Sequence, residues 1–480
     1  MNLRPILYIT GILLLILGVS LILPMMVDVY ANNNDWKIFF VCIVITTFFG
    51  GALYLSNAGY KAEIGVREAF LLTASSWVIV SIVGAMPFWL SELRLSFTDA
   101  IFESVSGITT TGSTVIQGLD QAPPGILIWR ALLQWLGGVG IIVMALSVLP
   151  FLKVGGMQLF RTESSQSEKV MPKVATLASS IAIVYVILTI LCILSYRLSG
   201  LGFFDSVAHS MTTIATGGFS TFDASIAAAN SLAVEITAII FMIAGSLPFV
   251  LYLKCASGDP KPLLKDTQAR TFFAILISII TVMTVYLVAS QGFDPLHALR
   301  LTSFNVTSIM TGTGYTSADF GLWGPFAVHL FFFVMVIGGC AGSTTCGIKI
   351  FRFQVLYSVA STQMKKLLHP HGVFIAKYNG RPLPQGVASS VLSFFFLFAL
   401  CFSILSLLLS LTGLDYLTAM SGAATSLANV GPGLGNEIGP GTTFQDLPDQ
   451  SKWILCIGML LGRLELFTIL VLISPHFWRR

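Results

Sequence analysis

The chain has 480 residues, of which 55% are hydrophobic and only 10% are charged, and its formal net charge is +4. A soluble globular protein carries about 25% charged residues, so this composition excludes a soluble domain. Most of the positive charges lie between the apolar runs, and they give no argument for binding nucleic acid. The sequence therefore predicts an all-α polytopic membrane protein.

Apolar runs of the length of a membrane span recur along the whole chain. A spanning helix needs about 20 mostly apolar residues. We expect ten such helices, in the runs 6–27, 38–60, 69–91, 131–152, 174–196, 236–253, 271–293, 321–348, 382–414 and the tail from 453. The first run could also be a signal peptide, but nine further runs follow it and no small-residue cleavage motif is visible.

Basic residues gather in the loops on the side of the membrane that holds both termini. An even number of spans puts the termini on one side, and an excess of Lys and Arg marks the cytoplasmic side. The basic loops are 153–173, 254–270 and 352–381, whereas the opposite side has few bases, among them Arg130 and Arg300. We therefore expect cytoplasmic termini. The basic loops could dock a cytosolic partner or attract anionic lipids of the inner leaflet.

Four short glycine turns each follow a half-length amphipathic stretch and precede an apolar run. Glycine turns 1 to 4 are residues 110–113, 216–219, 312–315 and 429–432. Their glycines Gly112, Gly218, Gly314 and Gly431 are 106, 96 and 117 residues apart, which indicates an internal repeat. The sequence predicts an extra helix pair (1–60) and four pseudo-fourfold repeats (61–173, 174–269, 270–381 and 382–480).

Each half-length stretch begins near an aspartate, in order Asp99, Asp205, Asp294 and Asp415. Aspartate is a preferred N-cap and complements the positive end of a helix, so we expect these side chains to be helix caps. A compatible alternative is a negatively charged outer vestibule for cations. A helix of about 12 residues covers about 18 Å, which is half the hydrocarbon core. The four stretches are therefore predicted to be re-entrant pore helices that end near the middle of the membrane.

Backbone that leaves a helix inside a bilayer must be buried in protein or line water. Inert re-entrant hairpins would explain one glycine turn, but four equivalent turns indicate a water-lined axis. The negative ends of the four helices would favour a cation there, and rings of carbonyl groups can replace the hydration shell of K⁺. We expect K⁺ to bind only at the carbonyls of Thr110, Thr111, Gly112, Thr216, Gly217, Gly218, Thr313, Gly314, Asn429, Val430 and Gly431.

The segments 106–114, 213–220, 310–315 and 428–433 resemble the filter motifs of the Trk/Ktr/HKT superfamily of potassium transporters, of the bacterial TrkH type. The resemblance covers nearly the whole chain. It implies K⁺ uptake across the bacterial inner membrane, a homodimer, and regulation by a cytosolic TrkA-type ring of RCK domains that binds a nucleotide. This chain would carry no cofactor and K⁺ would be its transported ion. In the family, glycine rather than serine at position 112 favours K⁺ over Na⁺, whereas turn 4 departs from the pattern in Asn429, Val430 and Pro432.

The eighth apolar run is interrupted by small and polar residues between 337 and 347. Glycine costs about 1 kcal/mol per helix position relative to alanine, so this stretch is a poor helix. It resembles the intramembrane gating loop of TrkH proteins, although close helix packing through small residues is the alternative. The gating residues that we predict are Gly338, Gly339, Gly342, Ser343, Thr344, Thr345, Gly347, Lys349 and Arg463.

Arg463 belongs to this set because it lies in the middle of the last apolar run. A charge at that depth usually faces a cavity or a partner, and residues i and i+2 of a helix do not face each other, which argues against a pair with Glu465. We expect Arg463 to hold the 338–347 loop. Glu103 and His209 each lie nine residues before a turn glycine, where they could brace the half-length helix or shape the outer mouth.

Two other classes of protein can be weighed from the sequence. Secondary transporters also have broken helices, but their repeats are usually inverted and carry buried coupling carboxylates, whereas these repeats run in parallel. No phosphate-binding loop, nucleophile–base pair or metal cluster indicates an enzyme. The sequence does not decide whether the protein is a channel or a transporter coupled to H⁺ or Na⁺. It also does not give the K⁺/Na⁺ selectivity or the nucleotide that regulates the complex.

Overall fold

The computed structural model describes residues 3–59, 65–147 and 170–479. Regular structure in these ranges is almost entirely helical, apart from a small antiparallel hairpin of β1 (Lys377–Tyr378) and β2 (Arg381–Pro382). The all-α class is thus confirmed. The basic loop 153–173 lies mostly outside the described residues.

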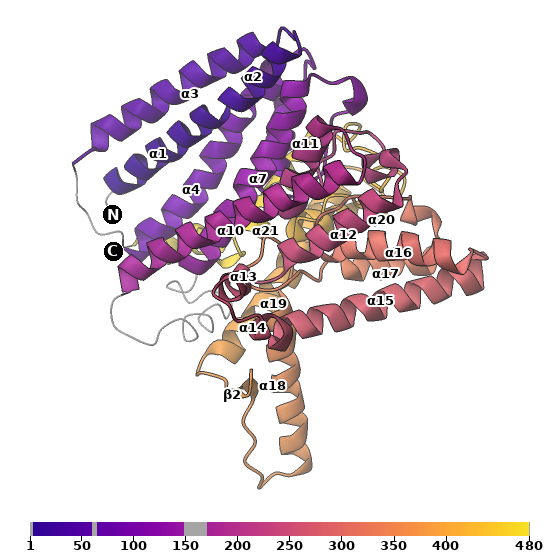
Figure 1. Ribbon diagram of the computed structural model, residues 1–480. Helices are drawn as coiled ribbons and strands as arrows, with labels where there is room; N and C mark the ends of the chain where they lie inside the picture. The colour runs from indigo at the N-terminus through magenta and orange to yellow at the C-terminus, as the bar shows by residue number, and fades with distance from the viewer. Residues whose placement is uncertain (1–2, 60–64, 148–169, 480) are drawn as a thin grey trace.

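An N-terminal helix pair lies at one edge of the molecule, where α1 and α3 run side by side (Figure 1). The pair consists of α1 (Arg4–Ser20), its continuation α2 (Ile22–Tyr30), and α3 (Trp36–Asn57). Gly11 and Gly50 lie where the two helices touch, since a methyl group on Gly11 would be 2.9 Å from the carbonyl oxygen of Gly50. Small residues let membrane helices approach closely, which explains this contact.

The remaining helices repeat one order four times: a long helix, a half-length helix, a glycine turn and a second long or broken helix. The first two sets are α4 (Val66–Gly84), α5 (Met86–Leu90), α6 (Phe97–Ile108), η1 (Leu119–Gln121) and α7 (Pro124–Ser147), then α10 (Val170–Leu198), α11 (Phe203–Ile214), η3 (Ser225–Ala229), α12 (Leu232–Ser246) and α13 (Phe249–Ala256). The third set is α14 (Lys261–Lys265), α15 (Thr267–Gln291), α16 (Pro295–Met310), η4 (Phe320–Leu322), α17 (Pro325–Val334) and α18 (Ile350–Leu368). The fourth set is α19 (Val387–Leu411), α20 (Tyr416–Ala428), α21 (Asp449–Arg463), α22 (Phe467–Ile473) and α23 (Pro475–Trp478).

Within the described ranges, seven helices are long and apolar enough to span a membrane, or nine if each of two bent pairs counts as one span. The bent pairs are α12–α13, with an angle of 95°, and α21–α22, with an angle of 113°. The predicted run 321–348 is not a continuous helix, because α17 has 10 residues and stops at Val334. The chain is therefore a multi-span membrane protein whose third repeat departs from the common order.

The expectation that an aspartate caps each half-length helix holds for two helices and is wrong for the other two. Asp294 and Asp415 are the N-caps of α16 and α20. The N-cap of α6 is Ser96, whose hydroxyl accepts from the backbone N–H of Asp99 in the first turn. Asp205 also lies in a first turn, and its carboxylate accepts from Thr221 at 2.7 Å. A carboxylate one turn inside the helix still complements the positive helix end, which is why the sequence pattern alone did not separate the two positions.

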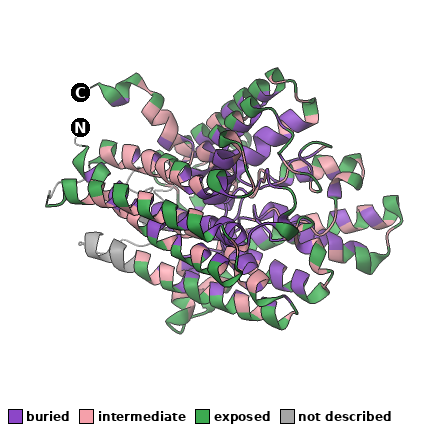
Figure 2. Cartoon of the chain, turned by 90° about the horizontal axis from the view of Figure 1, so that it is seen from above, coloured by how far each residue is buried: buried purple, intermediate pink, exposed green. Residues whose placement is uncertain are grey.

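Buried residues concentrate in the centre of the molecule, where the half-length helices and glycine turns meet, and the outer helix faces are exposed (Figure 2). This is the distribution expected when the outer faces meet lipid tails. Helix α18 and the β1–β2 hairpin project away from the helical body (Figure 1). The centre thus holds the four glycine turns and the irregular residues 335–349, and α18 begins directly after residue 349.

Candidate functional site

The four glycine turns share one unusual backbone conformation. Each has positive φ at two positions two residues apart: Thr110 and Gly112 (54° and 89°), Thr216 and Gly218 (51° and 78°), Gly312 and Gly314 (69° and 82°), and Asn429 and Gly431 (53° and 110°). Positive φ is uncommon for residues other than glycine, so its recurrence at the same place is informative. Turn 4 keeps the pattern in spite of its different side chains.

Each turn glycine faces a backbone carbonyl of the following turn, and the fourth faces the first. A methyl carbon built on the glycine would lie 2.2 Å (Gly112 to Gly217), 1.8 Å (Gly218 to Thr313), 2.1 Å (Gly314 to Val430) and 2.9 Å (Gly431 to Thr111) from the facing carbonyl oxygen. The contacts run in cyclic order through all four turns, so the turns close a ring. Glycine is required there because a side chain would displace the neighbouring carbonyl.

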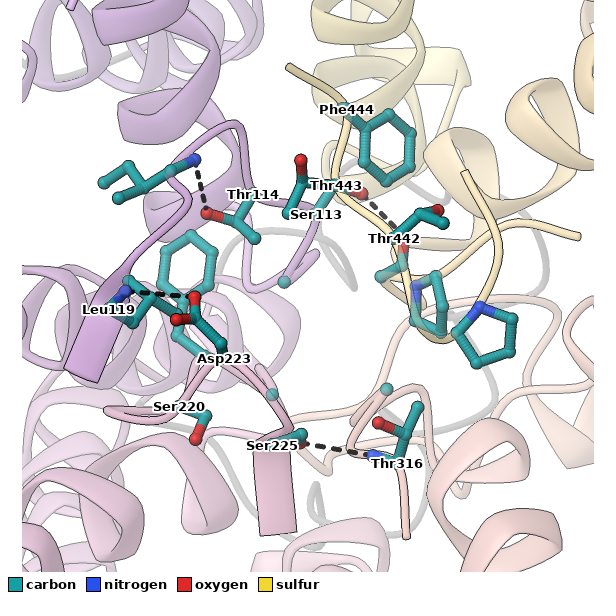
Figure 3. A pocket seen from close by; sticks show the side chains of 18 of the residues that line it. Ser113, Thr114, Leu119, Ser220, Asp223, Ser225, Thr316, Thr442, Thr443 and Phe444 are labelled. Atoms are coloured by element: carbon teal, nitrogen blue, oxygen red, sulfur yellow. Dashed lines mark hydrogen bonds between the residues drawn. The ribbon is translucent and has the colours of Figure 1, made fainter. Parts of the chain in front are cut away.

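The four turn glycines line one cavity of ≈ 80 Å³ together with residues of the loops that follow the turns (Figure 3). Hydroxyl groups of Ser113, Thr114 and Thr316 are among its polar lining. Asp223 also lines it, and one of its carboxylate oxygens accepts from the backbone N–H groups of Gly118 and Leu119, both at 3.0 Å. A small cavity with polar lining therefore adjoins the ring.

Glu103 and His209 bind residues that directly follow turns 1 and 2. The Glu103 carboxylate accepts from Arg130 Nε at 2.7 Å and from the Val115 backbone N–H at 3.0 Å, and the ion pair is almost fully buried. A buried charge is tolerated only when it is paired and hydrogen-bonded, as it is here. His209 Nε2 lies 3.0 Å from the Ser220 hydroxyl. These contacts fit the bracing role weighed from the sequence.

The sequence pattern counted Arg130 among the few bases on the side opposite the termini, but it did not predict that this side chain would be buried. Arg130 lies in α7 and its side chain is 1% exposed. Arg300 likewise lies in a helix, α16, where it binds Glu235 of α12 at 2.7 Å. A charge within an apolar stretch indicates a buried partner, and this rule would have found Arg130, because apolar residues flank it on both sides.

A second irregular segment, residues 335–349, joins α17 to α18, and we call it the intramembrane segment. Its two ends are tied together, since Gly338 N–H donates to the Ile348 carbonyl and Ile348 N–H donates to the Val336 carbonyl, both at 3.0 Å. Its tip binds other helices: Cys340 N–H donates to the Ser246 carbonyl at 3.0 Å, and Ala341 N–H donates to Gln268 Oε1 at 3.0 Å. The segment is thus a closed loop, whose ends are tied by a parallel bridge and whose tip contacts neighbouring helices.

The intramembrane segment touches the ring of glycine turns. Thr216 of turn 2 donates to the Thr344 hydroxyl at 3.2 Å, and that hydroxyl donates to the Gly245 carbonyl at 2.8 Å. Ser343 and Thr345 share a hydrogen bond of 2.8 Å, and Lys349 Nζ folds back onto the Thr345 hydroxyl at 3.1 Å. The predicted gating residues on this segment are buried, apart from the partly buried Gly347, and Thr344 links them to turn 2; they are Gly338, Gly339, Gly342, Ser343, Thr344, Thr345, Gly347 and Lys349.

Arg463 reaches this segment from the last repeat. Its guanidinium donates to the Thr344 carbonyl at 3.2 Å, to Cys346 Sγ at 2.7 Å and to the Gly137 carbonyl of α7 at 2.7 Å. Glu465 does not pair with it but binds Arg352 in the first turn of α18. The sequence pattern predicted that Arg463 contacts the 338–347 loop, but not that Arg352 pairs with Glu465, because these two residues are 113 positions apart.

In repeats 1, 2 and 4 a glycine of the second helix packs on the end of the half-length helix. A methyl carbon would lie 1.9 Å from the Ile108 carbonyl oxygen at Gly137, 3.0 Å from that of Ile214 at Gly245, and 2.1 Å from that of Leu427 at Gly462. In repeat 3 the second helix, α17, ends before this level and the intramembrane segment replaces it. The interruption is therefore specific to one repeat.

Among the described residues, no group of three or more His, Cys, Asp and Glu side chains is placed to hold a metal ion. The oxygen ligands that the ring itself offers are backbone carbonyls, and hydroxyl groups and the Asp223 carboxylate line the cavity beside it. These are hard oxygen ligands, which suit an alkali cation.

Fold and site together define a polytopic membrane protein in which one chain closes a ring of four re-entrant turns. The sequence model of the TrkH family, described as cation transport protein, matches residues 35–480. The chain belongs to this family, which comprises transport proteins and not enzymes.

Among its relatives, the Trk system potassium uptake protein TrkI of Halomonas elongata is 43% identical, over 99% of this chain and 97% of its own length. TrkH of Escherichia coli K12 is 36% identical over the full length of both chains. The crystal structure of the potassium transporter TrkH from Vibrio parahaemolyticus superimposes with a TM-score of 0.93 at 37% identity, again covering both chains completely. The resemblance stated from the motifs is confirmed.

Proposed function

We propose that this chain takes up potassium by letting K⁺ pass through the ring of glycine turns. The observation that carries the proposal is the cyclic contact of each turn glycine with a carbonyl of the next turn. Carbonyl groups in such rings replace the hydration shell of K⁺. The names of the full-length relatives, which are potassium uptake proteins, support the same ion.

Electrostatics favour a cation in the ring. Four half-length helices end at the turns, and the carbonyl end of a helix carries a partial negative charge. No acidic side chain belongs to the four turns, so selectivity would rest on carbonyl geometry rather than on a ring of carboxylates. K⁺, with Rb⁺ as its close substitute, is the ion that this geometry would prefer.

The intramembrane segment is proposed to be the gate on the inner side of the ring. It is buried, it contacts Thr216 of turn 2, and Arg463 fastens it to α7. Helix α18 starts where the segment ends and projects from the body (Figure 1), so a force on α18 would reach the gate. We place both termini and this helix on the cytoplasmic side of the bacterial inner membrane.

The proposed partners are a second copy of this chain and a cytosolic TrkA-type ring that binds the nucleotide. The basic segments 254–270 and 352–381, the second of which includes most of α18, would face that ring, since they lie on the proposed cytoplasmic side. A homodimer would contain two separate pathways, because one chain supplies all four glycine turns.

The test is cation flux into liposomes that contain only the purified chain, with K⁺, Rb⁺, Na⁺ and Li⁺ compared in parallel. We expect K⁺ and Rb⁺ flux without any H⁺ or Na⁺ gradient, and slower Na⁺ and Li⁺ flux. Flux that appears only with a coupling gradient would instead show a secondary transporter. Equal rates for Li⁺ and K⁺ would overturn the carbonyl-ring mechanism.

A further inference from the structure

Helix α7 carries two buried polar side chains, Arg130 and Gln134, that both reach glycine turn 2. They are four residues apart and therefore lie on one face of the helix. We propose that Gln134 is a positioning residue for ion selectivity, because it fixes the carbonyl group of Gly217 in the ring. This inference rests on the proposed function of the ring.

Gln134 forms a bracket across the turn. Its amide nitrogen donates to the Gly217 carbonyl oxygen at 2.6 Å, and its amide oxygen accepts from the Phe219 backbone N–H at 3.0 Å. The side chain is fully buried. Both bonds flank Gly218, which has positive φ, so the bracket fixes the backbone on the two sides of the turn glycine.

The carbonyl that Gln134 holds is one of the four that form the ring. Gly217 supplies the oxygen that faces Gly112, as Thr313, Val430 and Thr111 do in the other turns. In the described part of the chain, Gly217 is the one of these four whose carbonyl accepts a hydrogen bond from a side chain. A carbonyl oxygen has two lone pairs, so it can accept from Gln134 and still offer a lone pair to an ion.

The sequence of turn 2 explains why the bracket is needed there. Turns 1, 3 and 4 have Thr111, Thr313 and Val430 at this position, whereas turn 2 has glycine. A methyl carbon on Gly217 would lie 2.4 Å from Gln134 Cδ, so Gln134 occupies the space that a side chain at 217 would need. Two consecutive glycines are the most flexible backbone that a chain can offer, and the amide of Gln134 restores the missing constraint.

Arg130 holds the outer end of the same turn. Its guanidinium donates to the Ser220 carbonyl at 2.8 Å and lies 4.0 Å from the centroid of the Phe219 ring. Its pair with Glu103 ties this end to turn 1. Arg130 thus prevents the turn from moving as a whole, and Gln134 sets the direction of one carbonyl inside it.

The experiment compares K⁺ and Na⁺ flux of Gln134→Met with that of the parent chain in liposomes. Methionine has a similar length and makes neither hydrogen bond. We expect the K⁺/Na⁺ flux ratio to fall about tenfold, as expected for the loss of one or two buried hydrogen bonds. The main change would be faster Na⁺ flux, because a less constrained carbonyl adapts to the smaller ion.

A second variant tests positioning against simple packing. The double variant Gln134→Ala with Gly217→Thr gives turn 2 the side chain of turns 1 and 3 and removes the amide that would clash with it. We expect it to recover most of the K⁺/Na⁺ ratio that Gln134→Ala alone loses. The matched control is Gln354→Met, which removes two hydrogen bonds of a glutamine far from the ring, to Thr267 at 2.9 Å and Thr271 at 2.7 Å, and should leave the ratio unchanged.

The outcomes separate this inference from the proposed function. If the parent chain itself shows no preference for K⁺, the proposed function fails. If the parent selects K⁺ and a folded Gln134→Met variant selects it equally well, the inference alone is wrong. Should Gln134→Met not fold, Gln134→Asn decides: its shorter side chain cannot span both bonds, and an unchanged ratio in that variant would equally overturn the inference.

Discussion

The glycine turns and the intramembrane segment are both irregular, glycine-rich and buried, yet they are stabilised in different ways. Each turn follows the end of its own half-length helix and contacts the next turn through backbone atoms. The intramembrane segment occurs once, and it is held by backbone bonds to α12, such as that from Cys340 N–H to the Ser246 carbonyl, and by the side chains of Arg463 and Gln268. Four equivalent contacts that close a ring favour one fixed geometry, whereas a loop held by single, unrepeated contacts can be released when a few of them are exchanged.

The difference also shows where the repeats diverge. In three repeats a second helix with Gly137, Gly245 or Gly462 packs on the half-length helix, and in the third this helix is missing at the same level. Irregular backbone at mid-membrane depth is tolerated only when it is buried in protein or lines water. The third repeat, which lacks the helix, is therefore the part that we expect to move. The ring, to which all four repeats contribute a turn, is the part that we expect to stay fixed.

The largest effect is expected from a change in the ring. The substitution Gly218→Ala puts a methyl carbon 1.8 Å from the Thr313 carbonyl oxygen, at a position where φ is +78°. Strained backbone and the displaced carbonyl together cost about 3 kcal/mol, so we expect K⁺ flux to fall about 100-fold. Rb⁺ uptake into liposomes measures it.

The control for this variant is Gly118→Ala, which also has positive φ (+77°) but open space around the added methyl group. It carries only the cost of the left-handed conformation, about 1 kcal/mol, and should conduct normally. Normal Rb⁺ uptake in Gly218→Ala would show that the turns do not form a rigid ring.

A weaker but opposite effect is expected at the gate. Replacing Arg463 by alanine removes its bonds to Thr344, Cys346 and Gly137 and frees the segment on one side. We expect basal K⁺ flux to rise about tenfold, which corresponds to about 1.4 kcal/mol of lost stabilisation of the closed state. K⁺ flux into liposomes that contain only the purified protein, without the cytosolic partner, measures this leak.

Arg300→Ala is the matched control, because Arg300 likewise joins two helices, through an ion pair with Glu235, but lies outside the gate. Its basal flux should equal that of the parent chain. An unchanged leak in a folded Arg463→Ala variant would refute the role that we give to this arginine.

Much of this arrangement follows from local sequence patterns. The apolar runs, the glycine spacing and the break in 337–347 are visible in the sequence because hydropathy and glycine act on the residues that carry them. The isolated charge of Arg463 likewise indicated a buried partner. Two of the four expected aspartate caps were wrong, since a cap and a first-turn carboxylate give nearly the same pattern.

Contacts between distant residues could not be predicted in the same way. Gln134 binds Gly217 across 83 positions, and Arg352 binds Glu465 across 113. Such pairs depend on which helix faces which turn, and one sequence does not contain that information. The order of the turns around the ring also became visible only when each turn glycine was found against the next carbonyl.

The smallest effect is expected from a helix cap, which should influence stability but neither the ring nor the intramembrane segment. Asp294 caps α16 by accepting from the N–H groups of Leu296 and His297, both at 3.1 Å. Asp294→Ala should cost about 1 kcal/mol of stability, seen as a lower melting temperature in detergent, and should change neither the leak nor the ion selectivity.

Asp294→Asn keeps a capping oxygen but loses the negative charge, so it should melt like the parent chain. If Asp294→Asn instead reduces K⁺ flux at low ionic strength while its stability is intact, the charge itself matters, and the aspartates serve as a cation vestibule in addition to their structural role.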